Sequence, residues 1–253
     1  MGSSEGPLAR ALLVDDLLDQ ATASSDLSSS TQDAGDPRRH ATRMTNAIVV
    51  GGSVGGLLAG LVLAEVCDEV VLVERGELPD TPAPRAGVPQ GMHAHGLLAG
   101  GLAALEELLP GLSRELEQRG CPTGDNLRDA AWVFSGRRLA LGDSGVHGMT
   151  VARPVLEHAI RRRVAELPNL SIRTGARVKG LLYDAGRVTG VRIASAPSGA
   201  EEELTADLVV DASGRHSQLR SGSRRWGWRR RASRRSRSKR TTRVGSTRGV
   251  RTT

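Results

Sequence analysis

The stretch Ile48-Val49-Val50-Gly51-Gly52-Ser53-Val54-Gly55-Gly56 decides the fold of this chain. A short β-branched run, typical of a buried strand, passes through a cluster of glycines into residues with helical spacing. Residues 55–65 are predicted to form that helix, and the apolar run 70–73 is predicted to form a second buried strand. The order of strand, tight turn, helix and strand predicts a βαβ unit with parallel strands.

The glycine turn has the features of a pyrophosphate-binding turn. Gly51 would permit the sharp turn, and a side chain there would obstruct the pyrophosphate; Gly56 would permit close packing of helix on strand. Ser53 replaces the middle glycine of the G-x-G-x-x-G pattern. Free N–H groups at a helix start attract phosphate. Glu74 ends the second strand, where an acid can accept hydrogen bonds from ribose hydroxyls, so the two features together predict a nucleotide site.

Residues 47–64 admit a second interpretation, because they contain no charged side chain. Gly52, Gly56 and Gly60 recur at the spacing of small residues in paired transmembrane helices. The stretch is at the short limit for spanning a bilayer, and a strand ending in an acid follows it at βαβ distance. We therefore favour the nucleotide site and expect no transmembrane segment.

The middle of the chain continues the alternation of helices and strands. Proline opens one helical pattern at Pro154, where its missing N–H costs nothing. The adjacent Arg161, Arg162 and Arg163 are typical of a solvated helix face. Further helices are predicted at 97–109 and 154–167, and further strands at 131–134, 170–174, 178–183, 188–193 and 207–210. The pattern predicts an α/β fold.

Charge and cysteine content limit the classes of protein to consider. The 253 residues carry a formal net charge of +7, but residues 221–253 are rich in arginine and contain no acid, so the rest of the chain is acidic. The whole chain is therefore not a basic binding domain. Cys67 and Cys121 are too few for a disulfide framework or a four-ligand zinc site, and they fit a reducing compartment such as the cytoplasm.

The two ends of the chain differ in composition from the middle. Residues 1–43 are expected to form a disordered leader without a secretory signal, because they are poor in core-forming side chains. Residues 221–253 are expected to form a basic disordered tail. Translation in a shifted reading frame is one explanation of this tail, and binding to nucleic acid or an anionic membrane is another.

Five blocks in order resemble the FAD-dependent monooxygenases of the aromatic-hydroxylase type and their actinobacterial oxidoreductase relatives. The blocks are 50–56, Glu74-Arg75, 85–91, 151–156 and 207–217. The resemblance implies a glutathione-reductase-like FAD-binding Rossmann domain with inserted β-strands. Residues 44–220 would hold this domain and the start of a substrate domain. The family's third motif, Gly-Asp followed by proline, has no counterpart after residue 220, so we expect a domain that is incomplete at its C-terminus.

The resemblance also implies the cofactor-binding residues. They are Gly51, Ser53, Gly56, Glu74, Arg75, Arg85, Arg153, Val178, Asp211 and Gly214. Arg85 and Arg153 would offer forked guanidinium donors to the cofactor, although Arg85 could also be a solvated loop residue. The backbone of Val178 would lie beside the adenine, or Val178 could be an ordinary core residue. Asp211 would belong to a second fingerprint for FAD and NAD(P)H, in which Ser213 stands where aspartate is usual; alternatively, Asp211 caps a turn.

The function implied by the resemblance is flavin-dependent oxidation. NAD(P)H would reduce the flavin, which with oxygen would hydroxylate a small organic substrate. The cofactor carries this chemistry, so no catalytic side chain is predicted. His93 and His95 would lie in a loop near the flavin, and they lack the third ligand and the spacing of a metal site. We expect a small-molecule substrate, no specific nucleic-acid partner, and impaired turnover by this chain.

Two other classes of function stay open at this point. One is a dehydrogenase that binds NAD(P) alone at the glycine turn. The other is a polyanion-binding protein that acts through the arginine-rich tail at 221–253.

Overall fold

The computed structural model describes residues 44–85, 91, 94–214 and 217. The predicted leader at 1–43, the predicted tail at 221–253 and His93 lie outside the described residues.

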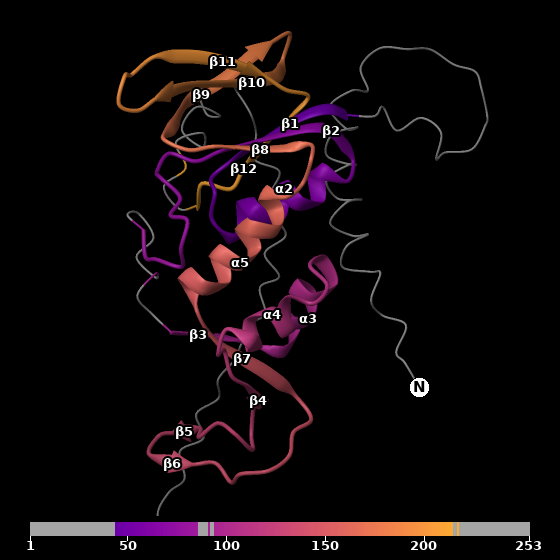
Figure 1. The fold of residues 1–253 in the computed structure, drawn as a ribbon, viewed down its shortest axis with the longest axis vertical. Helices are drawn as coiled ribbons and strands as arrows, with labels where there is room; N and C mark the ends of the chain where they lie inside the picture. Colours follow the sequence, from indigo (N-terminus) through magenta and orange to yellow (C-terminus); the bar gives the residue numbers. More distant parts are fainter. Residues whose placement is uncertain (1–43, 86–90, 92–93, 215–216, 218–253) are drawn as a thin grey trace, which may run out of the picture.

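A four-stranded parallel sheet forms the centre of the protein, with strand order β12-β1-β2-β8 (Figure 1). The strands are β1 (Met44–Val50), β2 (Cys67–Val73), β8 (Leu170–Arg173) and β12 (Leu208–Asp211). Helix α2 (Val54–Ala64) connects β1 to β2. The predicted βαβ unit is therefore confirmed, and the stretch 47–64 is a strand, a turn and a helix.

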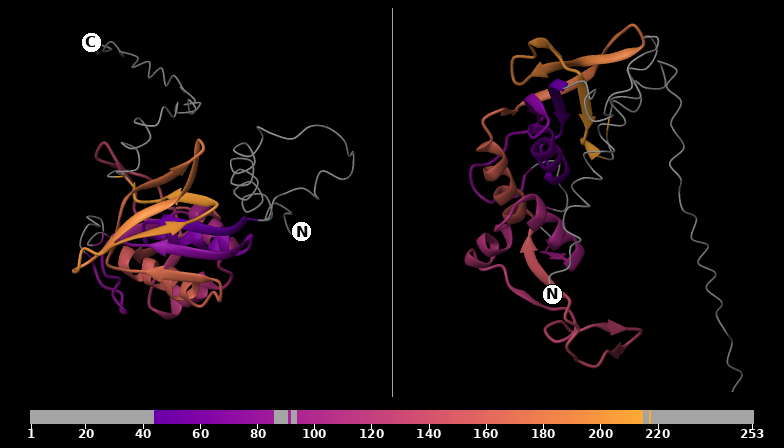
Figure 2. Two further views of the ribbon diagram at one scale, coloured as in Figure 1. Left: turned by 90° about the horizontal axis from the view of Figure 1, so that it is seen from above. Right: turned by 90° about the vertical axis from the view of Figure 1, so that its right-hand side faces the viewer.

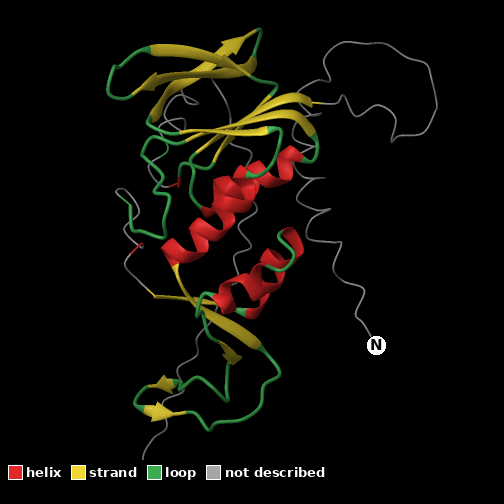
Figure 3. Ribbon diagram, viewed as in Figure 1, coloured by secondary structure: helices red, strands yellow, loops and turns green. Residues whose placement is uncertain are grey.

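The parallel sheet is covered on both faces, which explains why its strands are continuous apolar runs. Helices α2 and α5 (Arg153–Ala165) lie on one face (Figure 3). Leu57, Leu72 and Ile160 are fully buried there. An antiparallel sheet in the order β11-β10-β9 covers the other face, where Ile48 and Ile193 share a second core. Its strands are β9 (Ala176–Asp184), β10 (Arg187–Ser195) and β11 (Glu201–Thr205).

A third region, with helices and short strands, extends from the helix-covered face. It contains α3 (Ala99–Leu108), α4 (Leu112–Gln118) and an antiparallel sheet of β3 (Ala94–Leu97), β7 (His147–Ala152) and β4 (Thr123–Asp125). The hairpin of β5 (Val133–Phe134) and β6 (Arg137–Arg138) lies at the end of the molecule away from β9–β11 (Figure 2). The strand predicted at 131–134 is thus a short arm of this hairpin, and its Phe134 is exposed and stacked on Trp132 at 6.3 Å between ring centroids.

Together these elements confirm the α/β class and the Rossmann-like domain with inserted strands. Across the part of the chain that the structure describes, no helix is both long and apolar enough to cross a membrane.

Asp125 joins the two chain segments that flank the β5–β6 hairpin, at residues 127–128 and 144–145. Its side chain is 1% exposed, and its carboxylate accepts hydrogen bonds from the backbone N–H groups of Leu127, Arg128, Ser144 and Gly145. Burial opposes the negative charge. The hydrogen bonds outweigh burial and hold the pKa of Asp125 well below its ordinary value.

Asp125→Asn should make the stability of the fold depend less on pH below neutrality. Because the native pKa is lower than the unfolded pKa, the charged carboxylate stabilises the fold above about pH 4, and this contribution is lost as the pH falls further. Thermal unfolding between about pH 3 and pH 7 should show the wild type losing more stability on acidification than the variant. Equal losses would contradict the assignment.

Candidate functional site

The ends of three parallel strands meet at the glycine turn. Gly51 N donates to Val73 O at 2.8 Å, and Ala212 N donates to Val50 O at 2.9 Å. The turn after β1 is therefore flanked by the ends of β2 and β12. The carboxyl edge of a parallel sheet is where ligands of open α/β proteins bind.

Two glycines of the turn are required by the backbone around them. Gly51 has a φ of +108°, and a Cβ there would lie 2.8 Å from Ala212 O. A Cβ on Gly56 would lie 1.7 Å from Gly51 O, whereas one on Gly55 would meet nothing within 4 Å. A side chain at Gly51 thus meets the end of β12. From the sequence we predicted that a side chain at Gly51 would obstruct the pyrophosphate. In the structure the nearest atom that it would meet is the backbone oxygen of Ala212.

The first turn of α2 presents backbone donors without partners inside the helix. The N-cap residue Ser53 makes no capping bond with its side chain, and the first turn contains no acid. Intrahelical bonding starts with Leu57 N, which donates to Ser53 O at 2.9 Å. The N–H groups of Val54, Gly55 and Gly56 precede it and have no acceptor within the helix. This donor set, with open space beside Gly55, fits a pyrophosphate.

Glu74 lies directly against the turn. Its side chain is buried; Oε2 accepts from Gly52 N at 2.6 Å and Oε1 accepts from Gly76 N at 3.0 Å. Arg75, the next residue, is exposed. Glu74 therefore holds the turn to the end of β2, and the ribose contact of Glu74 stays a prediction.

Arg85 is buried at the turn, so the solvated-loop interpretation is wrong. Its side chain is 10% exposed, and its Nε donates to Glu157 Oε1 at 2.7 Å. Nη2 donates to Gly52 O at 3.2 Å, and Nη1 lies 3.5 Å from Glu74 Oε1. All three nitrogen atoms of the Arg85 guanidinium therefore contact oxygen atoms of the protein.

Arg153 lies on the other side of Glu157, at the start of α5. Its Nη2 donates to Ser53 Oγ at 3.0 Å, and Ser53 Oγ donates to Glu157 Oε2 at 2.9 Å. Arg153 Nε lies 3.9 Å from Glu157 Oε2 and is a buried atom without a hydrogen-bond partner among the described residues. Arg153 therefore keeps a donor that the protein does not use.

The four ionised side chains Glu74, Arg85, Arg153 and Glu157 form a charged cluster with no net charge at the glycine turn. Sequence reasoning missed Glu157, although its spacing of four residues from Arg153 on one helix was a usable signal. Pairing matters here because a buried ion without a partner is strongly unfavourable.

Helix α5 also holds the segment that carries Arg85. His158 Nε2 lies 2.7 Å from Asp80 O, and the Arg161 guanidinium donates to Pro79 O. Burial lowers the pKa of Arg161, so this side chain is not part of a solvated face as predicted. These contacts fix the segment between Glu74 and Arg85 against the helix.

For the predicted residues Val178 and Asp211 the structure supports the alternative interpretations, and for these two and Gly214 it does not test a contact with a cofactor. Val178 is 9% exposed in the second core, as the alternative interpretation holds, and its strand β9 is at the edge of its sheet. Asp211 accepts from Ser213 N at 3.1 Å and from the Ser217 hydroxyl, so it does cap a turn. Gly214 has a φ of +81° within that turn. The role of each toward a cofactor stays a prediction.

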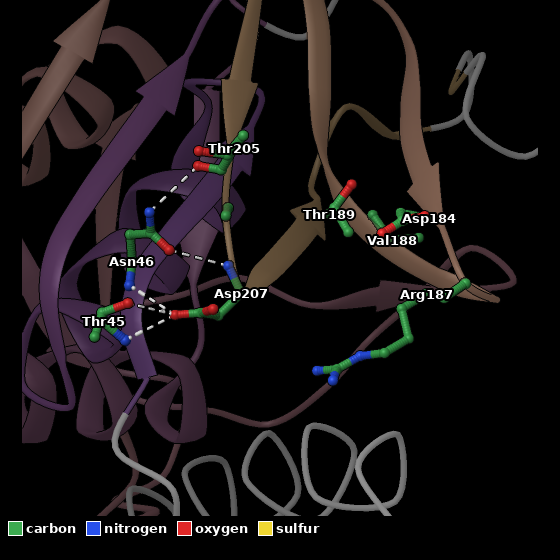
Figure 4. Close-up of a pocket in the computed structure, with 10 residues that line it drawn as sticks. Thr45, Asn46, Asp184, Arg187, Val188, Thr189, Thr205 and Asp207 are labelled. Atoms are coloured by element: carbon green, nitrogen blue, oxygen red, sulfur yellow. Dashed lines mark hydrogen bonds between the residues drawn. The ribbon is translucent and has the colours of Figure 1, made fainter. Parts of the chain in front are cut away.

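A separate pocket of about 520 Å³ lies at the opposite end of β1 (Figure 4). There the Asp207 carboxylate accepts from Thr45 N at 2.9 Å and from Asn46 N at 3.2 Å. These bonds join the start of β1 to the residue that precedes β12, and they lie away from the glycine turn. His95 is on strand β3 and not in a loop, and no group of three or more possible metal ligands occurs among residues 44–85, 91, 94–214 and 217.

A parallel sheet with a glycine turn, an uncapped helix and an acid at its carboxyl edge defines a dinucleotide-binding protein of the Rossmann type. The sequence model of a family described as an FAD binding domain matches residues 44–224, and the chain belongs to this family. The predicted resemblance to FAD-dependent monooxygenases is confirmed at this level.

Three known proteins show the range of similarity. Protein Rv3254 of Mycobacterium tuberculosis is 37% identical over 210 residues, covering 78% of this chain and 42% of that protein. Kynurenine 3-monooxygenase of Salinispora arenicola is 33% identical over 189 residues, covering 70% of this chain and 38% of that protein. The crystal structure of p-nitrophenol 4-monooxygenase PnpA from Pseudomonas putida shares the fold, with a TM-score of 0.53, 23% identity, and coverage of 70% of this chain and 43% of that one. The chain spans less than half the length of each of these proteins.

Proposed function

We propose that this chain binds FAD at the glycine turn and provides the cofactor-binding part of a monooxygenase that takes electrons from NAD(P)H. The observation that carries the proposal is the set of unpartnered N–H groups at the start of α2, beside Glu74 and the unused donor of Arg153. The family match favours FAD over a dehydrogenase that uses NAD(P) alone.

The chain's own residues would bind and orient the cofactor. The backbone of 51–56 and the guanidinium of Arg153 would take the pyrophosphate, since both offer donors to anionic oxygens. Glu74, with Arg75 beside it, would take the ribose, and the outer backbone edge of β9 at Val178 would lie beside the adenine. FAD supplies the redox chemistry when bound. No side chain of the described residues is assigned a catalytic role.

The finer parts of the proposal rest on the relatives. Kynurenine 3-monooxygenase and p-nitrophenol 4-monooxygenase are named for small organic substrates, and we propose a substrate of this class here. We assign residues 44–220 to the FAD-binding domain with the first part of a substrate domain, in which β3–β7 would belong to the latter. Both cysteines are free and buried, which suits the reducing cytoplasm that we propose as its location.

Titration of the full chain with FAD and with ADP tests the proposal. We expect saturable quenching of flavin fluorescence, reversed by ADP because the ADP half would occupy the turn. Glu74→Ala should weaken ADP binding about tenfold or more, since a hydrogen bond to a charged group contributes about 1.5 to 3 kcal/mol.

A ligand control separates the ribose contact of Glu74 from its support of the turn. Wild type should prefer ADP to 2′-deoxy-ADP, and Glu74→Ala should bind the two equally. Equal loss for both ligands would leave Glu74 with a structural role alone. Tight binding of NAD(P) without binding of FAD would overturn the proposed function.

A further inference from the structure

The hydroxyl of Ser53 is turned away from the helix that Ser53 begins. Serine is among the preferred N-cap residues because its oxygen accepts from the N–H groups of the second and third helical residues. Ser53 has the extended backbone of an N-cap, with φ −90° and ψ 178°, yet its side chain makes no capping bond. The groups that it would cap are the N–H groups of Gly55 and Gly56.

Glu157 and Arg153 provide the bonds that Ser53 makes in place of the cap: Glu157 accepts the hydroxyl proton and Arg153 donates to the hydroxyl oxygen. Ser53 Oγ donates to Glu157 Oε2 at 2.9 Å and accepts from Arg153 Nη2 at 3.0 Å. Glu157 is 5% exposed, and its other oxygen accepts from Arg85 Nε at 2.7 Å. The carboxylate is thus fixed from two sides, and a hydrogen bond to an ionised acceptor is stronger than one between neutral groups.

We propose that Glu157 is a positioning residue that keeps Ser53 from capping α2, and so leaves the N–H groups of Gly55 and Gly56 open to a phosphate. This inference rests on the proposed nucleotide function and deepens it. A glycine at the middle position of G-x-G-x-x-G has no hydroxyl to compete for these donors. Ser53 introduces such a competitor, and the carboxylate on α5 holds it aside.

A second role of Glu157, its ion pair with Arg85, makes a single variant ambiguous. Loss of that pair could weaken ligand binding by loosening the turn. The two roles differ in their dependence on Ser53, because only the capping role needs the serine hydroxyl. The test therefore measures the effect of Glu157→Met in two backgrounds, wild type and Ser53→Gly.

Isothermal titration with ADP is the measurement. In the wild-type background we expect Glu157→Met to weaken binding about fivefold, the factor that one side-chain cap corresponds to. In the Ser53→Gly background the same change should weaken binding clearly less, because only the loss of the Arg85 pair then remains. Glu166→Met, which alters an exposed glutamate at the end of α5, is the matched control and should leave affinity unchanged in both. An equal loss in the two backgrounds would overturn the proposal.

Hydrogen exchange of the unaltered protein keeps the proposal testable if Glu157→Met does not fold. By NMR, the amide of Gly55, which is an exposed residue, should exchange rapidly without ligand and become protected with ADP. Slow exchange in the ligand-free protein would show that the helix is capped and would overturn the inference. Absence of ADP binding by wild type would instead count against the proposed function, while the ligand-free exchange rates would still report on Ser53.

Discussion

Gly56→Ala is expected to abolish nucleotide binding and to destabilise the fold by about 3 kcal/mol or more, because added bulk in a packed site forces the backbone to move. The new Cβ would lie 1.7 Å from Gly51 O, inside the turn that joins β1 to α2. The contacting atom belongs to the backbone, so no side chain can rotate to relieve the overlap. Either the turn or the start of α2 must shift, and both carry the proposed donors.

Gly55→Ala is the matched control for this substitution. It adds the same methyl group one residue earlier in the same helix, where nothing lies within 4 Å. Replacing glycine by alanine in a helix contributes up to about 1 kcal/mol, so the stability of this variant should hold or rise. Urea unfolding followed by circular dichroism measures both. Equal stability of the two variants would show that the turn does not have the geometry described.

The centre of the fold was predictable because its signals are local. The apolar runs at 48–50 and 70–73 are each buried on both faces, so they read as strands without any knowledge of their neighbours. The glycine turn between them fixes the direction of the chain. The turn at Asp184-Ala185-Gly186 has a local signal of the same kind, a sequence typical of turns, and Ala185 and Gly186 both have positive φ there.

Elements that depend on distant partners were not predictable from local pattern. Strand β11 begins with Glu201, Glu202 and Glu203, an unusual start for a strand, and it forms by pairing with β10 at the sheet edge. Helix α4 has seven residues, too few for a clear helical period. Only the last two residues of β7, Val151 and Ala152, lie in the family block at 151–156, and no strand was predicted there.

In the candidate site, too, residues with a local sequence signal were predictable, and residues brought in by distant contacts were not. The glycines and Glu74 follow one another along the βαβ unit, so spacing alone pointed to them. Glu157 is 83 positions beyond Glu74 in the sequence numbering and joins the site because α5 packs beside α2. Glu157 matters because it bonds to Ser53 and Arg85, and residue spacing along the sequence does not reveal these two contacts.

Arg85→Met should destabilise the protein by about 3 to 5 kcal/mol, the usual cost of breaking a buried ion pair by removing one partner. The guanidinium lies 2.7 Å from Glu157 Oε1 and 3.5 Å from Glu74 Oε1, and all three side chains are at least nine-tenths buried. Methionine fills similar space without a charge. The carboxylates of Glu74 and Glu157 would then repel each other in the interior. Arg153 would be the nearest remaining cation to Glu157.

A compensating substitution distinguishes unpaired charge from simple loss of packing. Glu157→Met added to Arg85→Met removes one of the stranded carboxylates, so the double variant should recover part of the lost stability, measured by urea unfolding at neutral pH. Arg162→Met, at an α5 position where the side chain is 53% exposed, should change stability by less than about 1 kcal/mol. If Arg85→Met is as mild as Arg162→Met, or if the second substitution only adds to the loss, then the charged cluster does not hold the turn. Recovery in the double variant would show that Arg85 stabilises the site by neutralising carboxylates.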